Sequence, residues 1–376
     1  MNNLIKILQL SDIHLGNKLN STEKIVNALR HYFRSNQKEF SKLSMIVLVG
    51  DVYDRLLNTS SSDYILSIEW LTELVIFCKN NNIKLRILEG TPSHDWKQCK
   101  VLYTIIDRLN IDVDFKYIET LHIEIMTDLN LSVLYVPDEW KHKASETYNE
   151  ILELMVANNL SKVDVVFMHG QFHYQLPMIR LESSFSEEDM LNIVNYYISI
   201  GHIHTPSVFE RILAQGSFDR LAHNEEEDKG GIVVTIDKSK GDFSYRFIKN
   251  EKAMLFKTYR YEEEELDFII QDLEDKISKL PIGSNIRIIS NNEDYLTKSV
   301  KVLKEKFINM VIKAEKPKVK DNKYKILEDK LIIESFSITK DNLKTLLSEC
   351  MEKHNLNDES LSIFNNELSI VMDSVE

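Results

Sequence analysis

The chain has 376 residues, of which 43% are apolar and 28% charged, and its formal net charge is −13 at pH 7. This length suffices for one large domain and one or two smaller modules, whereas the charge excludes a protein that coats DNA by bulk electrostatics, since that affinity comes from Lys and Arg. No apolar run of about eighteen residues predicts a membrane span and the N-terminus lacks a signal-peptide pattern, so we expect a cytoplasmic protein with no membrane association.

Over the first two hundred positions, short runs of Val, Ile and Leu alternate with longer amphipathic stretches, a pattern typical of an α/β fold. The predicted strands are 4–10, 45–49, 84–88, 131–136, 163–168 and 196–200. The predicted helices are 22–40, 63–80, 99–109, 144–159 and 187–196. Shorter strands with glycine-containing turns over 206–248 are expected to complete the sheets.

The composition changes after residue 249, where a small second domain is predicted. Its expected elements are an acidic helix over 262–280, a strand over 285–289, a helix over 297–307 and a strand over 309–312. A Lys-rich, proline-containing segment over 313–325 is typical of a solvated linker. We therefore divide the chain into a main domain (1–250), a capping domain (251–315), a linker with a strand (316–337) and a C-terminal helical pair (338–376).

The helical pair has an apolar stripe along each helix, at the spacing of one helix face. These stripes contain Leu343, Leu346, Leu347, Met351, Leu361, Phe364 and Leu368. Because such a pair alone would expose a large apolar patch, we expect it to bind a partner protein.

Histidines and aspartates directly follow the predicted strands. They are Asp12 and His14, then Asp51, then His94 and Asp95, then His169, and finally His202 and His204. The carboxyl ends of strands in an open α/β sheet form the crevice where ligands bind, so we expect these side chains to converge. Imidazoles and carboxylates are natural ligands of divalent transition metals, and their ordered recurrence predicts a metal pair.

The order Asp-x-His, Gly-Asp, His-Asp, His-Gly and Gly-His-x-His, over residues 8–204, resembles the calcineurin-like metallophosphoesterases. Four further segments are similar to the SbcD family of double-strand-break nucleases: Leu-Ser-Asp-Ile-His-Leu-Gly at 10–16, Gly-Asp-Val-Tyr-Asp at 50–54, Gly-Ser-Phe-Asp-Arg-Leu at 216–221 and Lys-Gly-Gly at 229–231. The resemblance implies an α/β fold, in which a β-sandwich is flanked by helices and followed by a small α+β capping domain and the C-terminal helical pair.

The resemblance also implies a ligand set. Asp12, His14, Asp51 and His204 would hold one ion, and Asp51, His169 and His202 a second, with Asp51 bridging the pair. Mixed nitrogen and oxygen ligands favour Mn²⁺, with Mg²⁺ as the alternative. Water activated by the two ions would attack a phosphodiester, while His94 contacts the scissile phosphate and Asp95 orients its imidazole.

One position departs from the family pattern. The family usually places an Asn directly before the histidine that corresponds to His94, and Ser93 stands there in this chain. A hydroxyl is a shorter and weaker ligand than an amide carbonyl, so we expect Ser93 to reach the second metal through water or not at all. The second ion is therefore predicted to bind less tightly.

The resemblance implies a metal-dependent DNA exonuclease and endonuclease in a recombination and double-strand-break repair complex. Its partners would be DNA and an SbcC-like coiled-coil ATPase, with a homodimer inside a heterotetramer; the sequence at Ser93 is similar to phage variants, which would place it in a host cytoplasm. Two other interpretations stay open: a generic phosphodiesterase for small esters, and a catalytically weak scaffold that binds DNA ends or regulates the ATPase. The acidic run over 225–228 is predicted to be solvated surface.

Overall fold

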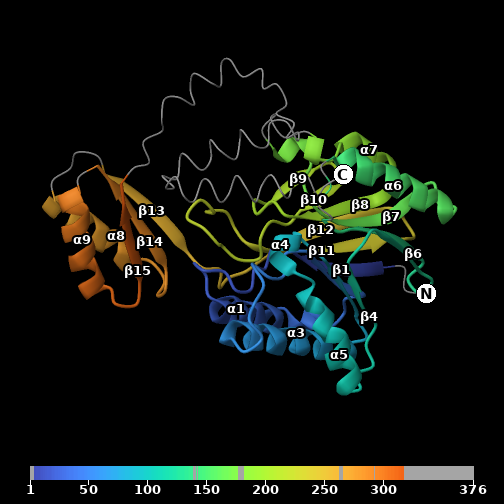
Figure 1. The fold of residues 1–376 in the computed structure, drawn as a ribbon, viewed down its shortest axis with the longest axis horizontal. Helices are drawn as coiled ribbons and strands as arrows, with labels where there is room; N and C mark the ends of the chain where they lie inside the picture. The colour runs from blue at the N-terminus through green and yellow to red at the C-terminus, as the bar shows by residue number, and fades with distance from the viewer. Residues whose placement is uncertain are drawn as a thin grey trace, which may run out of the picture. The chain divides into compact units, whose positions relative to one another are not determined.

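The computed structural model describes residues 4–138, 141, 143–176, 182–261, 266–291 and 293–316, and its first large sheet runs through the middle of the main domain (Figure 1). The strands are β1 (Leu4–Leu10), β2 (Met45–Val49), β3 (Lys84–Leu88), β4 (Phe115–Ile118), β11 (Gly230–Asp237) and β12 (Asp242–Lys249). Their order is β12-β11-β1-β2-β3-β4. Strands β1 to β4 are parallel to one another, β11 is antiparallel to β1, and β12 is antiparallel to β11.

A second mixed sheet packs against the first. Its strands are β5 (His122–Met126), β6 (Leu131–Val136), β7 (Val163–His169), β8 (Val194–Gly201), β9 (Ser207–Phe209) and β10 (Ile212–Ala214), in the order β5-β6-β7-β8-β10-β9. The core between the sheets includes Val47 and Val49 of β2 and Val165 and Phe167 of β7, all fully buried. Strand β2 is buried at every position because its alternate residues, such as Ile46, face a helical layer instead.

Helices cover the outer face of each sheet, as Figure 1 shows. The first sheet is covered by α1 (Thr22–Ser35), α3 (Ser62–Asn80) and α5 (Val101–Arg108), and the second by α6 (Ala144–Ala157) and α7 (Glu187–Asn192). This four-layer arrangement of helices, sheet, sheet and helices confirms the predicted fold class.

The elements differ from the sequence prediction in a few places. The helix predicted over 22–40 is two helices, α1 and α2 (Gln37–Phe40), because Asn36 leaves the helical conformation and bonds back to the Tyr32 carbonyl. The helix predicted over 187–196 ends at Asn192, and β8 begins at Val194, since the following β-branched and aromatic residues favour a strand. The short strands β4 and β5 were not predicted.

The segment after residue 250 forms a third, three-stranded parallel sheet with its own core. It consists of β13 (Phe256–Tyr261), α8 (Leu266–Ser278), β14 (Asn285–Ser290), α9 (Glu293–Lys306) and β15 (Val311–Glu315), in the strand order β13-β14-β15. Apolar residues that include Ile269, Leu273, Ile286 and Leu303 are buried between the helices and the sheet. Both helices and the strands β14 and β15 were predicted, but β13 was not.

The predicted linker strand and C-terminal helical pair lie outside the described residues, and so do the partner-binding residues Leu343, Leu346, Leu347, Met351, Leu361, Phe364 and Leu368. Within the part of the chain that the structure describes, no helix combines the length and apolarity needed to cross a lipid bilayer.

A buried ion pair joins the two large sheets at one edge. Arg86 of β3 is 1% exposed, and its Nε and Nη2 atoms donate to the two carboxylate oxygens of Glu124 of β5, each at 2.9 Å. The hydroxyl of Tyr135 donates to the same carboxylate at 3.0 Å. Burial alone would lower the pKa of Arg86, but Glu124 keeps the guanidinium charged by raising it.

We expect Arg86→Ala to destabilise the fold by about 3–5 kcal/mol, because it leaves the Glu124 carboxylate buried without its main counter-charge. The matched control is Arg30→Ala, since Arg30 makes a bidentate contact of the same type with Glu73, at 2.9 and 2.6 Å, on the exposed surface. That change should cost less than about 1 kcal/mol. Urea unfolding monitored by circular dichroism measures both, and equal losses would contradict the role given to Arg86.

Candidate metal centre

The carboxyl ends of five strands from both large sheets meet at one place. Asp12 and His14 follow β1, Asp51 follows β2, His94 comes after β3, His169 ends β7, and His202 and His204 follow β8. Their ligand atoms form three groups, within each of which the atoms lie no more than 4.8 Å apart: Asp12, His14 and His204; His14, Asp51 and His94; and Asp51, His169 and His202. The structure therefore brings together the residues that the sequence placed at strand ends.

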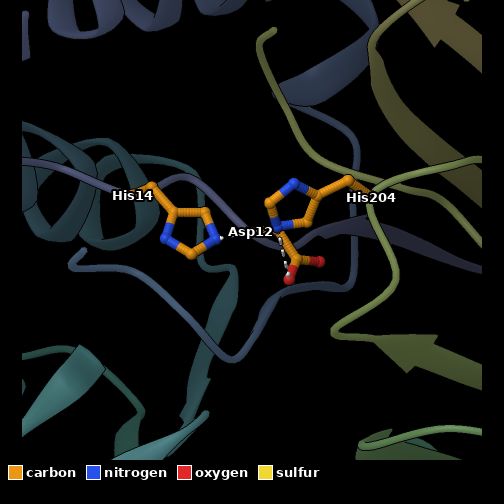
Figure 2. Close-up of side chains that lie close together, drawn as sticks. All are labelled: Asp12, His14 and His204. Carbon is orange, nitrogen blue, oxygen red and sulfur yellow. Dashed lines mark hydrogen bonds and ion pairs between the residues drawn. The ribbon is translucent and has the colours of Figure 1, made fainter. Parts of the chain in front are cut away.

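The first group has the geometry of a shared ligand site. The Nε2 atoms of His14 and His204 lie 3.1 Å apart, and Asp12 Oδ1 lies 4.0 Å from His204 Nε2. Figure 2 shows the two imidazole rings turned toward one another with the Asp12 carboxylate beside His204. Two nitrogens that bind the same ion, each at about 2.1 Å, lie about 3 Å apart when the N–metal–N angle is about 90°. The observed spacing therefore fits a shared divalent ion.

Asp51 lies between the groups and its two oxygens face different histidines. Asp51 Oδ1 is 3.3 Å from His169 Nε2, whereas Oδ2 is 2.9 Å from His94 Nδ1 and 3.8 Å from His14 Nε2. Burial alone would raise the pKa of this carboxyl, but the imidazoles of His169, His94 and His14 hold the pKa well below its usual range. An ionised carboxylate with two divergent oxygens suits a bridging ligand.

The outer nitrogens of two histidines are fixed by acceptors. His169 Nδ1 donates to the Val49 carbonyl at 2.9 Å, and His204 Nδ1 lies 3.0 Å from Glu225 Oε1. These contacts direct Nε2 of each ring inward, as is usual for histidines that bind metals. Burial would lower the pKa of His169, but Asp51 raises it to about 10, so metal binding at this imidazole must release a proton.

The backbone is strained at the ligands themselves. Asp12, His14, Asp51 and His202 have φ values of 51°, 55°, 50° and 100°, a left-handed region that costs about 1–3 kcal/mol per residue and is common at functional sites. The turns are held by hydrogen bonds between them. Asp12 N–H donates to Gly50 O at 3.1 Å, and His202 N–H donates to Asp12 Oδ1 at 3.0 Å. The ligands are thus positioned by the fold.

Two glycines, Gly50 and Gly90, allow the ends of β2, β3 and β7 to lie close together. Gly50 has φ +81°, and a Cβ atom there would lie 2.2 Å from His169 Nδ1. A Cβ atom on Gly90 would lie 2.1 Å from the Asp51 backbone nitrogen. Any side chain at either position would push apart the loops after β2 and β3 and the end of β7.

The structure places Thr91, and not Ser93, against the second group. Thr91 Oγ1 lies 3.2 Å from Asp51 Oδ2, 3.5 Å from His169 Nε2 and 3.4 Å from His202 Nδ1. Ser93 is exposed on the short helix α4 (Pro92–Asp95), and its carbonyl accepts from the Trp96 indole. The sequence indicated Ser93 because it directly precedes His94. In the structure, the turn after Gly90 instead brings Thr91 to the cluster.

His94 and Asp95 contact different parts of the site. The His94 imidazole is half-buried beside Asp51, whose hydrogen bond raises the His94 pKa more than burial lowers it. Asp95, expected to orient His94, instead accepts from the backbone N–H groups of Tyr53 and Gly90, both at 2.8 Å. Asp95 therefore ties the loops after β2 and β3 together, and it is Asp51 that orients the imidazole.

A buried acid and a buried lysine support His204, and the sequence prediction gave neither of them this role. Glu225, predicted to be solvated surface, is 5% exposed, and Lys229 is 0% exposed. Lys229 Nζ lies 3.0 Å from Glu225 Oε2 and donates to the His204 carbonyl at 2.9 Å. Burial would raise the pKa of Glu225, but His204 and Lys229 lower it to about 2. The available sequence signal was the Lys-Gly-Gly segment at 229–231.

A cavity of about 340 Å³ adjoins the second group. His169 and His202 line one side of it, and Asp138, Gln171 and Phe185 line other parts. Together with the half-buried His94, it leaves the cluster accessible to a substrate.

The mixed sandwich and the clustered His and Asp side chains define a metal-dependent phosphoesterase. The chain matches the calcineurin-like phosphoesterase family over residues 5–206 and belongs to that family.

Among solved structures, it is similar to "GAP50 the anchor in the inner membrane complex of Plasmodium", with 12% identity, a TM-score of 0.39, and coverage of 66% of this chain and 86% of that one. Another crystal structure covers 65% of this chain and 99% of its own, also at 12% identity and a TM-score of 0.39. No curated protein matches the sequence.

We expect Thr91→Ala to weaken metal binding by about 10- to 100-fold, because the Thr91 hydroxyl holds Asp51 Oδ2 at 3.2 Å and faces His169 and His202. Isothermal titration with Mn²⁺ measures the affinity. Ser93→Ala is the matched control on the next turn and should leave it unchanged. The opposite ranking of the two variants would restore Ser93 as the ligand.

We expect Glu225→Gln to weaken Mn²⁺ binding by about 10- to 100-fold, because the neutral amide no longer fixes the His204 ring or compensates Lys229. Glu226→Gln serves as the control, since Glu226 pairs with Lys257 on the surface. Identical titration curves for the two variants would show that Glu225 has no role in the metal centre.

Proposed function

We propose that the protein is a metal-dependent DNA nuclease of the SbcD type, which hydrolyses phosphodiester bonds by attack of a metal-activated water. The observation that carries the proposal is the half-buried His94 imidazole, held 2.9 Å from Asp51 beside the buried ligands Asp12, His14 and His169. The SbcD-like segment at 216–221 adds support, because Ser217 N–H donates to the His204 carbonyl at 3.1 Å and Asp219 accepts from Met254 N–H.

The residues divide into two ligand sets around Asp51. We assign Asp12, His14, Asp51 and His204 to one ion, and Asp51, His169 and His202 with Thr91 beside them to the second. When bound, two divalent ions supply an activated water and neutralise the phosphate charge. The donor set favours Mn²⁺ over Mg²⁺ because imidazole nitrogens predominate.

His94 supplies the proton chemistry of the proposal. Its Nδ1 is held by Asp51, so Nε2 is left to contact a phosphate oxygen or the leaving oxygen. A histidine in this position can act as a general acid or bind an anionic oxygen.

We further propose that the protein acts as a homodimer in a heterotetramer with an SbcC-like coiled-coil ATPase, bound through the apolar stripes of the C-terminal segment. The net charge of −13 supports a partner, since metal ions and a second protein must then provide much of the attraction for DNA. A role in a viral recombination system is part of the same proposal.

The test compares a plasmid-length duplex with bis(p-nitrophenyl) phosphate, using the full chain and Mn²⁺. We expect both to be hydrolysed, and His94→Ala to slow cleavage by about 10²- to 10⁴-fold while metal titrations stay unchanged. Asp51→Asn is the control that should lose metal binding and activity together.

Other outcomes identify the alternatives. Hydrolysis of the small diester without any cleavage or binding of DNA would indicate a generic phosphodiesterase. DNA binding without cleavage, unaffected by His94→Ala, would indicate a scaffold.

A further inference from the structure

An exposed tryptophan lies two residues beyond His94 and has no part in the metal centre. Trp96 is 54% exposed, whereas Trp70 is buried in the core. Single exposed apolar side chains are common on proteins and need no explanation by themselves. The hydrogen bond and the backbone conformation of Trp96, however, do require an explanation.

The Trp96 indole is hydrogen-bonded to its own turn. Its Nε1–H donates to the Ser93 carbonyl at 2.8 Å, which satisfies its only polar atom inside the α4 turn. What remains exposed is therefore the apolar aromatic surface. A ring that keeps its hydrogen bond while exposing its carbon atoms is suited to contact a flat apolar ligand.

The backbone is strained to present this ring. Trp96 and Lys97 have consecutive left-handed conformations, with φ values of 49° and 55°. Bulky residues rarely adopt this region, and each instance costs about 1–3 kcal/mol. The turn is held from inside: the buried carboxylate of Glu89 accepts from the Lys97 N–H at 2.9 Å, and Asp95 accepts from Gly90 and Tyr53. The fold thus maintains an unfavourable turn beside His94.

The charges beside this ring are only partly compensated. Lys97 and Lys100 both pair with the single carboxylate of Glu119, at 3.3 and 2.9 Å, so one of their two positive charges is balanced. The remaining lysine charge can attract a phosphate, and the exposed indole adds a different contact, because every nucleobase has an aromatic face that an indole can stack on.

Resting on the proposed nuclease function, we propose that Trp96 is a stacking platform for an unpaired nucleobase next to the scissile phosphate. The ligand class is a single-stranded or frayed nucleic acid end, because a base within a duplex offers no free face. Stacking on one aromatic side chain accounts for roughly 5- to 150-fold in affinity and depends little on base identity.

The test measures binding and hydrolysis separately. Anisotropy of a fluorescein-labelled single-stranded oligonucleotide with a hydrolysis-resistant phosphorothioate backbone, in Mn²⁺, reports binding to the full chain, and Mn²⁺ assays report hydrolysis of an unmodified oligonucleotide and of bis(p-nitrophenyl) phosphate. We expect Trp96→Ala to weaken oligonucleotide binding and lower its kcat/KM about tenfold, with hydrolysis of the small diester unchanged. Trp96→Phe should retain most of both, and Tyr245→Ala, which removes an exposed aromatic ring from β12, should change neither.

Two further comparisons vary the salt concentration and the strandedness of the nucleic acid. The loss in Trp96→Ala should be similar at low and high salt, unlike a phosphate contact, and smaller on a closed duplex than on a single strand. Equal losses on oligonucleotide and small diester would overturn the proposal, since Trp96 would then act by positioning His94. No loss on either would also overturn it. A wild-type chain that hydrolyses the diester but neither binds nor cuts oligonucleotides would instead show that the nuclease function itself is wrong.

Discussion

The structure depends on a buried carboxylate held among imidazoles. Asp51 is almost completely buried, a state that costs several kcal/mol for an isolated charge, and it is stabilised by Thr91 N–H at 2.6 Å and by His94 and His169. Without these partners the same burial would be unfavourable. The arrangement is therefore sensitive to any loop that moves, and it explains why a glycine is needed at Gly90, against the Asp51 backbone.

The double-sheet architecture makes this site possible. Asp51 follows a strand of the first sheet, whereas His169 and His202 come from the second, so the ligand set exists only when the sheets pack with their carboxyl ends together. The packing is secured by the apolar core between the sheets and by the Arg86–Glu124 pair. His169 adds a direct link, because its Nδ1 donates to the Val49 carbonyl of β2. Stability and site geometry thus rest on the same contacts.

Two carboxylates show how supporting residues differ from ligands. Asp95 joins the loops after β2 and β3 through backbone N–H groups, and Glu225 holds His204 while compensating the buried Lys229. Neither offers a ligand atom to the three groups around Asp51. Both act by fixing where the imidazoles and turns lie, which is what a metal centre with strained ligands requires.

The sequence alone determined the strand ends and the residues that follow them, because alternating apolar runs and the short turns after them are local properties of the chain. The bounds of β1, β2, β3 and β6 and the positions of Asp12, His14 and Asp51 were readable in this way. Only the tertiary structure decided that Thr91 replaces Ser93 at the cluster, that Asp95 binds backbone instead of His94, and that Glu225 is buried. Those outcomes depend on the path of a turn and on contacts between segments far apart in sequence, which local periodicity does not encode.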